Sequence, residues 1–257
     1  MTKKHISFSE LKIWAECPYK HKLKYIDGVE GFTGNIFTAF GTAIHSVCEN
    51  IAKGELEPID YDEFFDLNFL AELKKLDEKP TSKMITEFRE QGKQIPPEVF
   101  PELKKHFGTF KVFSTEETLY QKIEELKFEH YLKGFIDLVI QTEDGKYHIL
   151  DWKTCSWGWD REKRSEKLVT YQLTLYKKFF CEKHGVEPKN VETHFGLLNR
   201  TAKNERVEIF RVTSGTRKTD NAVKLLTDGC RSISKGLKMK NRNSCSKCEF
   251  NKTKHCQ

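Results

Sequence analysis

The sequence predicts an α/β protein in which helices flank a mixed β-sheet. The chain has 257 residues, 37% of them hydrophobic, which is enough for one large or two small domains with a sizeable core. Extended and helical patterns alternate along its second half, and a tight turn signal joins two of the extended segments. This alternation is typical of a sheet packed between layers of helices.

Two helices are expected in the N-terminal segment. Residues 7–10, Ser-Phe-Ser-Glu, have capping-box spacing, and Leu11 and Trp14 recur three residues apart towards Cys17. Pro18 is expected to bend or restart this helix. A second helix should run from about residue 40 to 53, with a core stripe of apolar residues at helical spacing: Ile44, Val47, Cys48 and Ile51.

Residues 58–110 read as charged helices interrupted by Pro80 and by three further prolines at 96, 97 and 101. Strands are predicted over 117–123, 131–141 and 147–154, and the last two are joined by a turn at 143–145, Glu-Asp-Gly. A helix over 165–183, strands over 191–198 and 206–212, and a helix over 215–235 complete the chain.

The predicted hairpin places Asp137 and Asp151 side by side. Two carboxylates can hold a hard divalent cation, and Mg²⁺ typically takes one or two of them together with waters and phosphate oxygens. Lys153 points to the same face as Asp151, because side chains alternate along a strand, so its ammonium suits a bound phosphate. Gln172 and Tyr176 share one helix face and could hydrogen-bond the phosphate or the lysine.

These five residues in this order resemble the PD-(D/E)XK nuclease superfamily, and within it the RecB-like exonucleases and CRISPR-associated nucleases. The resemblance implies a restriction-endonuclease-like fold and hydrolysis of DNA, from ends or in single strands, with Mg²⁺ or Mn²⁺ in recombination, repair or DNA processing. Residues 41–45, Gly-Thr-Ala-Ile-His, look like the family segment whose histidine is a metal ligand, which implies that role for His45. Glu117 matches an acidic position on the preceding strand, and adjacent Glu116 is the alternative.

Two features depart from the usual family pattern. Ile136, not proline, precedes Asp137, and the second carboxylate is an aspartate rather than a glutamate. Both departures are common in the RecB-like branch.

The cysteines suggest a metal clasp between the two ends of the chain. No signal-peptide pattern opens the sequence, so we expect a cytoplasmic protein, or one of the host cytoplasm if viral, with reduced thiols. Similar nucleases bind a 4Fe-4S cluster through one early and three late cysteines, which here correspond to Cys17, Cys245, Cys248 and Cys256. Zinc held by the same thiolates is the alternative, and His255 could replace Cys256. The remaining four cysteines are expected to be small buried apolar residues: Cys48, Cys155, Cys181 and Cys230.

On this basis we expect a single nuclease domain. Its parts are N-terminal helices over 1–57, a helical insert over 58–115, the nuclease core over 116–234, and a basic cysteine-rich tail over 235–257. No apolar run approaches the roughly 20 residues that span a bilayer, so no membrane contact is expected.

Nucleic-acid contacts are expected at two places. The net charge is only +6, but the tail is locally basic and could neutralise phosphates. The loop after the strand of Asp151 could stack on bases of a single strand, a contact worth about 1–3 kcal/mol per base. Its candidate residues are aromatic or basic: Trp157, Trp159, Arg161 and Arg164.

Two other functions stay open at this point. One is a non-catalytic scaffold that binds DNA ends in recombination, and the other is a zinc-stabilised RNA-processing nuclease, because nothing in the sequence distinguishes DNA from RNA. The chain has no phosphate-binding loop of the Gly-x-x-x-x-Gly-Lys-Ser/Thr type, so any unwinding would come from a separate helicase or recombination protein.

Overall fold

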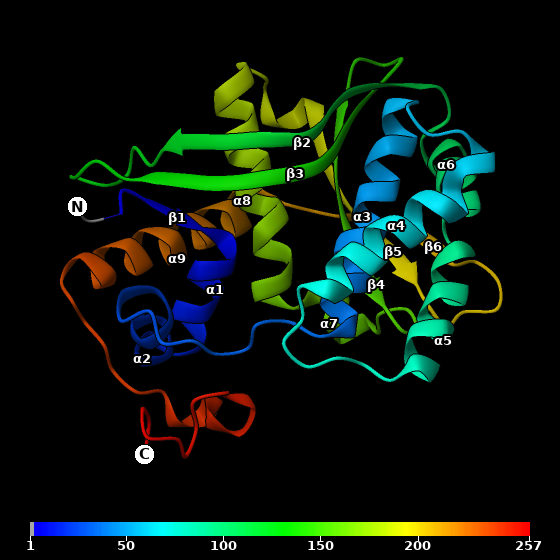
Figure 1. The fold of residues 1–257 in the computed structure, drawn as a ribbon. Coiled ribbons are helices and arrows are strands. Elements are labelled where there is room, and N and C mark those ends of the chain that lie inside the picture. Colours follow the sequence, from blue (N-terminus) through cyan, green and yellow to red (C-terminus); the bar gives the residue numbers. More distant parts are fainter. Residues whose placement is uncertain (1–2) are drawn as a thin grey trace. The chain divides into compact units, whose positions relative to one another are not determined.

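The computed structural model describes residues 3–257 and confirms an α/β fold with a mixed six-stranded sheet and flanking helices (Figure 1). The strands are β1 (His5–Ser7), β2 (Phe110–Lys122), β3 (Tyr131–Thr142), β4 (Tyr147–Cys155), β5 (Val191–Asn199) and β6 (Val207–Val212). The α-helices are α1 (Phe8–Glu16), α2 (Pro18–His21), α3 (Ile36–Lys53), α4 (Tyr61–Lys74), α5 (Ser82–Lys93), α6 (Pro96–Phe107), α7 (Arg161–Ser165), α8 (Lys167–His184) and α9 (Thr216–Ser234).

The chain forms two compact units. Unit 1 contains the residues up to Thr33 together with Thr118–Gly134 and Gly215–Gln257, and unit 2 contains Gly34–Glu117 and Phe135–Ser214. The long strands β2 and β3 contribute residues to both.

The sheet of unit 2 is mixed because its connections differ. Strands β3 and β4 form an antiparallel hairpin closed at Gly145, whose φ of 78° suits the turn. Strand β5 lies parallel to β4 after the crossover through α8, and β6 returns antiparallel to β5. The parallel β4–β5 ladder extends from Tyr147↔Val191 to Cys155↔Asn199.

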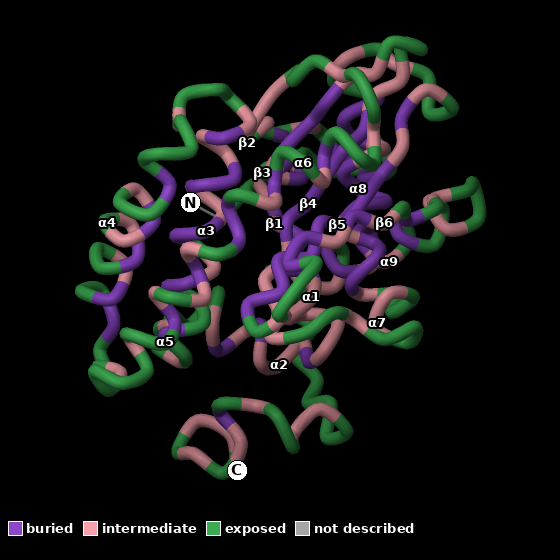
Figure 2. The backbone as a smooth tube through the Cα atoms, turned by 90° about the vertical axis from the view of Figure 1, so that its right-hand side faces the viewer, coloured by how far each residue is buried: buried purple, intermediate pink, exposed green. Residues whose placement is uncertain are grey.

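Helices cover both faces of this sheet. On one face, Leu150 and Trp152 of β4 join a buried cluster with apolar residues of α3, α4, α5 and α6. On the other face, Tyr147 of β4 contacts Phe180 of α8, with ring centroids 5.7 Å apart. Side chains alternate between the faces of a strand, so each face of β4 meets a different helical layer. Figure 2 shows buried residues concentrated along β4 and β5.

Unit 1 is built around the N-terminal helices and α9. Strand β1 pairs parallel with the first residues of β3, and Ser7 caps α1 by accepting a hydrogen bond from the Glu10 amide at 3.2 Å. Gly229 of α9 lies against Leu11, because a Cβ there would come within 2.7 Å of the leucine.

Several boundaries differ from the sequence-based expectation. Helix α3 begins at Ile36, since Asn35 and Thr38 form a reciprocal cap, and β2 begins at Phe110. The helix expected over 165–183 begins at Lys167, because Glu166, with ψ of 127°, separates it from the short helix α7. Pro101 lies inside α6 rather than interrupting it.

The four cysteines without an expected site follow the prediction in part. Cys48, Cys181 and Cys230 are buried, whereas Cys155 is only half-buried. Among residues 3–257, no helix combines the length and apolar character that crossing a membrane requires.

Gly196 of β5 is a packing constraint beside the motif strand. It pairs in register with Trp152, and a Cβ at this position would lie 2.3 Å from the indole ring. Gly196→Ala should therefore lower the free energy of unfolding by about 1–3 kcal/mol through overpacking. Urea denaturation measures this change. Gly158→Ala is the matched control, since its Cβ would make only an ordinary 3.5 Å contact with Glu208; equal stability of the two variants would contradict the packing argument.

Candidate active site

The candidate site forms where the β3–β4 ladder ends. The last regular pair is Leu138↔Leu150, and one further step of the antiparallel register places Asp137 opposite Asp151. The Trp152 amide donates to Asp137 Oδ2 at 2.7 Å. The ladder therefore gives way to a hydrogen bond between backbone and carboxylate, and this bond fixes the Asp137 side chain.

The remaining motif residues surround Asp151. Lys153 Nζ forms an ion pair with Asp151 Oδ2, as their shared strand face predicts. Gln172 of α8 donates its amide to Asp151 Oδ1 at 2.9 Å and lies 3.3 Å from the Tyr176 hydroxyl. The structure thus brings together four of the predicted residues on β4 and α8.

His45 reaches the same site from α3. Its Nδ1 lies 3.6 Å from Asp137 Oδ2. Burial, together with the positive charge of Lys153, lowers the pKa of His45 to about 4, so its imidazole is neutral at pH 7. A neutral imidazole has the free lone pair that metal ligation requires.

Of the two neighbouring glutamates on β2, Glu116 is the one whose charge acts on the aspartates. The Glu117 carboxylate binds Lys183 Nζ at 2.6 Å and His184 Nε2 at 2.8 Å, and so is held by α8. Burial raises the pKa of Glu116, and the negative charges of Glu49 and Asp151 raise it further, which places Glu116 in the field of the site. Glu116 has φ of 49°, and this local break in the strand's alternation gives no signal in the sequence.

The electrostatics of the site reveal an excess of negative charge. Burial raises the pKa of Asp137 well above its usual range, and repulsion from Asp151 adds to the effect. Burial also raises the pKa of Asp151, although Lys153 opposes this. Burial opposes the charge of Lys153 as well, but its attraction to the two aspartates leaves its pKa raised and the ammonium protonated. The single positive charge of Lys153 does not balance the negative charges of the two aspartates.

This donor set fits a divalent cation. In the described part of the chain, the buried Asp151 Oδ2 is paired with the Lys153 ammonium, and this oxygen keeps a second lone pair for a cation. Two carboxylates and an imidazole suit Mg²⁺ or Mn²⁺. Within residues 3–257, no three of these ligand atoms lie within 4.8 Å of one another, so binding a cation requires the side chains to move closer together.

The loop after β4 presents one free ring. Trp157 is 75% exposed, whereas Trp159 packs on Phe195 with ring centroids 5.2 Å apart. Arg164 Nη1 pairs with Glu208 Oε1 at 2.7 Å, while Arg161 is exposed. Of the four residues expected to contact nucleic acid, the structure leaves Trp157 and Arg161 open to solvent and packs the other two against the protein.

The four cysteines expected at a cluster all belong to unit 1, but the structure does not gather their thiols. Cys17 is buried, the other three are half-buried, and all four are free. No three of their sulfur atoms lie within 4.8 Å of one another in residues 3–257. The tail nevertheless reaches Cys17, because the Asn241 amide donates to its Sγ at 3.3 Å and the Tyr19 amide donates to the Met239 carbonyl at 3.1 Å.

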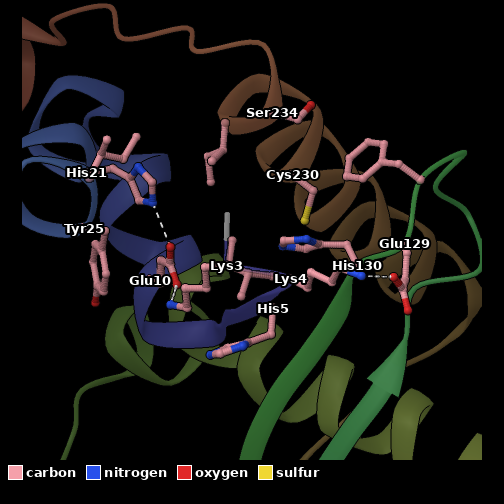
Figure 3. A pocket seen from close by; sticks show the side chains of 14 residues that line it. Lys3, Lys4, His5, Glu10, His21, Tyr25, Glu129, His130, Cys230 and Ser234 are labelled. Atoms are coloured by element: carbon pink, nitrogen blue, oxygen red, sulfur yellow. Dashed lines mark hydrogen bonds and ion pairs between the residues drawn. The ribbon is translucent and has the colours of Figure 1, made fainter. Parts of the chain in front are cut away.

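A separate cavity of about 600 Å³ lies in unit 1 and contains none of the predicted site residues (Figure 3). Glu10 there is buried and binds His21 Nε2 at 3.0 Å and Lys3 Nζ at 2.5 Å. Burial opposes ionisation of Glu10, yet these two hydrogen bonds lower its pKa. Lys4 pairs with Glu129 at 2.5 Å, so the charged groups around this cavity are paired with one another.

Comparison with known proteins agrees with this geometry. The family model described as the PD-(D/E)XK nuclease superfamily matches residues 5–253. This chain belongs to that superfamily. The members of this superfamily are nucleases, so the match indicates phosphodiester hydrolysis as the class of activity.

Solved structures support the fold. A candidate exonuclease from Eubacterium rectale superposes with a TM-score of 0.59 at 15% identity, and the match covers 96% of this chain and 86% of that chain. A second structure, SSO0001, gives a TM-score of 0.45 at 12% identity over 97% of this chain and 85% of that chain. This TM-score is too low to indicate a common fold. No curated protein sequence matches with significance.

The raised pKa of Asp137 generates a stability prediction. A carboxyl group whose pKa is raised in the folded state favours folding when it is protonated, and this contribution is lost as pH rises through the folded-state pKa. In EDTA, Asp137→Asn should therefore melt at a higher temperature than wild type near about pH 8. The difference should shrink towards about pH 4. Thermal scans by circular dichroism measure it, and the exposed Asp220→Asn is the control. A pH-independent difference would refute the electrostatic explanation.

Proposed function

We propose that this protein is a divalent-metal-dependent deoxyribonuclease that acts as an exonuclease on DNA ends or single strands. The observation that carries the proposal is the convergence of Asp137, Asp151 and Lys153 where two strands diverge, with Asp151 buried and paired to the lysine. A purely structural ion pair needs one carboxylate, whereas this site holds two beside one ammonium, with Asp151 buried and Asp137 half-buried.

Each side chain has a role that follows from its surroundings. A divalent cation held by Asp137, Asp151 and His45 would polarise the scissile phosphate and lower the pKa of an attacking water. Lys153 keeps its proton and stabilises charge that develops on the phosphate. Gln172 orients Asp151 by donating to Oδ1, and the Tyr176 hydroxyl stays protonated because burial raises its pKa.

The preference for single strands or ends rests on the loop after β4. Trp157 offers an exposed indole on which a base can stack, and Arg161 can contact a phosphate. Stacking of this kind needs unpaired bases, which a DNA end or a single strand supplies.

The test is a cleavage assay with end-labelled single- and double-stranded DNA in Mg²⁺ or Mn²⁺. Wild type should release nucleotides from linear DNA and spare circular single-stranded DNA. Lys153→Ala should be at least about 100-fold slower, the cost of removing one preorganised charge from a transition state. RNA of the same sequence is the comparison substrate.

Three results would contradict the proposal in different ways. DNA binding without cleavage in either metal would favour a non-catalytic scaffold, and preferred cleavage of RNA would favour an RNA-processing nuclease. Unchanged activity of Lys153→Ala would refute the assigned mechanism.

The neighbouring glutamates provide a matched pair of variants. Glu116→Gln should weaken metal binding, because Glu116 contributes negative charge to the site. The Mn²⁺ concentration that gives half-maximal activity should therefore rise. Glu117→Gln should leave it unchanged, because that carboxylate binds Lys183 and His184. The reverse order would show that Glu117 rather than Glu116 serves the metal.

We also propose that Cys17, Cys245, Cys248 and Cys256 bind a 4Fe-4S cluster, with zinc as the alternative. The hydrogen bond from the Asn241 amide to Cys17 Sγ supports this, since amide donors commonly stabilise cluster thiolates. Because the four thiols are not gathered, assembly of a cluster requires the tail to close further around Cys17.

Protein purified without oxygen should absorb broadly near about 400 nm and contain iron and sulfide. Cys17→Ser should lose this absorbance, whereas the half-buried Cys155→Ser, in unit 2, should keep it. If the wild-type protein is colourless, contains zinc and still cleaves DNA, the cysteines bind zinc rather than iron. That result would leave the nuclease proposal intact.

A further inference from the structure

Two histidines and a glutamate converge at the other end of the β4–β5 ladder from the motif residues. His148 pairs in register with Glu192, and His194 lies two residues further along β5. One ligand atom from each of the three lies within 4.8 Å of the other two. Among residues 3–257, these three form the one group of metal-ligating side chains with that spacing.

The distances match tetrahedral coordination. His148 Nδ1 lies 3.2 Å from His194 Nε2 and 4.0 Å from Glu192 Oε2. Two nitrogen ligands bound to zinc at about 2.0–2.1 Å are separated by about 3.3 Å when the geometry is tetrahedral. The imidazole pair therefore already has the separation that zinc needs, and Glu192 Oε2 must move less than about 1 Å closer to His148 Nδ1.

The tautomer of His148 is set by its neighbours. Thr142 Oγ1 donates its only proton to Asp144 Oδ1 at 2.5 Å, so it can only accept from His148 Nε2, which lies 3.1 Å away. The proton of the neutral ring is thus on Nε2, and the lone pair of Nδ1 faces His194 and Glu192. An oxygen that accepts from the second ring nitrogen is the usual support of a metal-ligating histidine.

Glu192 is oriented in a similar way. Its Oε1 binds Arg211 Nη2 at 3.1 Å, which leaves Oε2 directed towards His148. Arg211 also balances part of the carboxylate charge, so one oxygen remains for a cation.

The histidine pair is buried and uncharged. His194 is only 2% exposed, and its Nε2 faces His148 Nδ1 at 3.2 Å, while the Nδ1 on the other side of its ring has no hydrogen-bond partner in the described residues. Burial lowers the pKa of both histidines, to about 3 for His194, so both rings are neutral at pH 7 and repel a cation little. Phe107 packs on both rings, with centroids 5.0 and 4.9 Å away, and excludes water from that side.

Solvent reaches the cluster through a pocket of about 340 Å³. Its lining includes His106, Thr142 and His148 together with the acidic turn residues Glu143 and Asp144. The pocket can admit a cation and supply water as the fourth ligand, and its acidic rim attracts positive charge.

We propose that His148, His194 and Glu192 form a zinc site that clamps β4 to β5, with water from this pocket as the fourth ligand. Two imidazoles, one carboxylate and one water are a donor set that zinc accepts, whereas magnesium prefers oxygen ligands. The site shares no residue with the acidic centre or the four cysteines.

The test measures zinc bound per chain after EDTA treatment, saturation with Zn²⁺ under reducing conditions and removal of free metal. His148→Gln should bind one zinc fewer than wild type, because the other candidate metal sites are intact in both proteins. His130→Gln, at a half-buried histidine of unit 1, is the matched control and should bind as many as wild type. Thr142→Val should weaken zinc binding by about 10- to 100-fold through loss of the orienting hydroxyl.

A second measurement separates this site from the cysteines. Co²⁺ bound to nitrogen and oxygen gives weak d–d bands, whereas thiolate ligands add intense sulfur-to-metal charge transfer. The difference spectrum between wild type and His148→Gln should contain only the d–d bands. Zinc should also raise the melting temperature of wild type more than that of the variant.

Equal zinc content and equal thermal shifts in wild type and His148→Gln would overturn the proposal, as would a difference spectrum that contains sulfur charge transfer. If His148→Gln does not fold in metal-free buffer, Glu192→Gln decides, because its half-buried side chain lies at the edge of the cluster. Either result leaves the proposed nuclease activity to its own assay.

Discussion

The placement of two like-charged carboxylates, one buried and one half-buried, next to a single ammonium is the constraint on which the site depends. The β3–β4 hairpin sets it, because the antiparallel register brings Asp137 and Asp151 together where the ladder ends. Trp152 contributes to both the site and the core: its amide fixes Asp137, and its indole packs on Gly196. The fold thus maintains an arrangement that electrostatics alone would disperse, and a bound divalent cation would relieve the repulsion.

Much of this could be predicted from the sequence, because local rules determine it. The turn at 143–145 fixes the hairpin register, and period-2 alternation puts Asp151 and Lys153 on one face. Helical spacing likewise identifies the buried stripe of α3 and places Gln172 near Tyr176. In each case the positions of a few neighbouring residues in the sequence determine which side chains share a face.

Other features depend on backbone conformation or on long-range register, which the sequence does not reveal. Glu116 has a positive φ within β2, and no residue type marks this position. The break between α7 and α8 at Glu166 has no proline or glycine. His148 and His194 are 46 residues apart and meet only through the parallel pairing of β4 with β5.

Strand β4 carries His148 and Asp151 three residues apart on opposite faces, about 10 Å along the chain. A paramagnetic ion lodged among the histidines would therefore lie close to nuclei around the acidic centre without touching the nucleic acid. The enhancement of nuclear relaxation by such an ion depends on distance. It would therefore report in solution how close a substrate comes to the acidic centre.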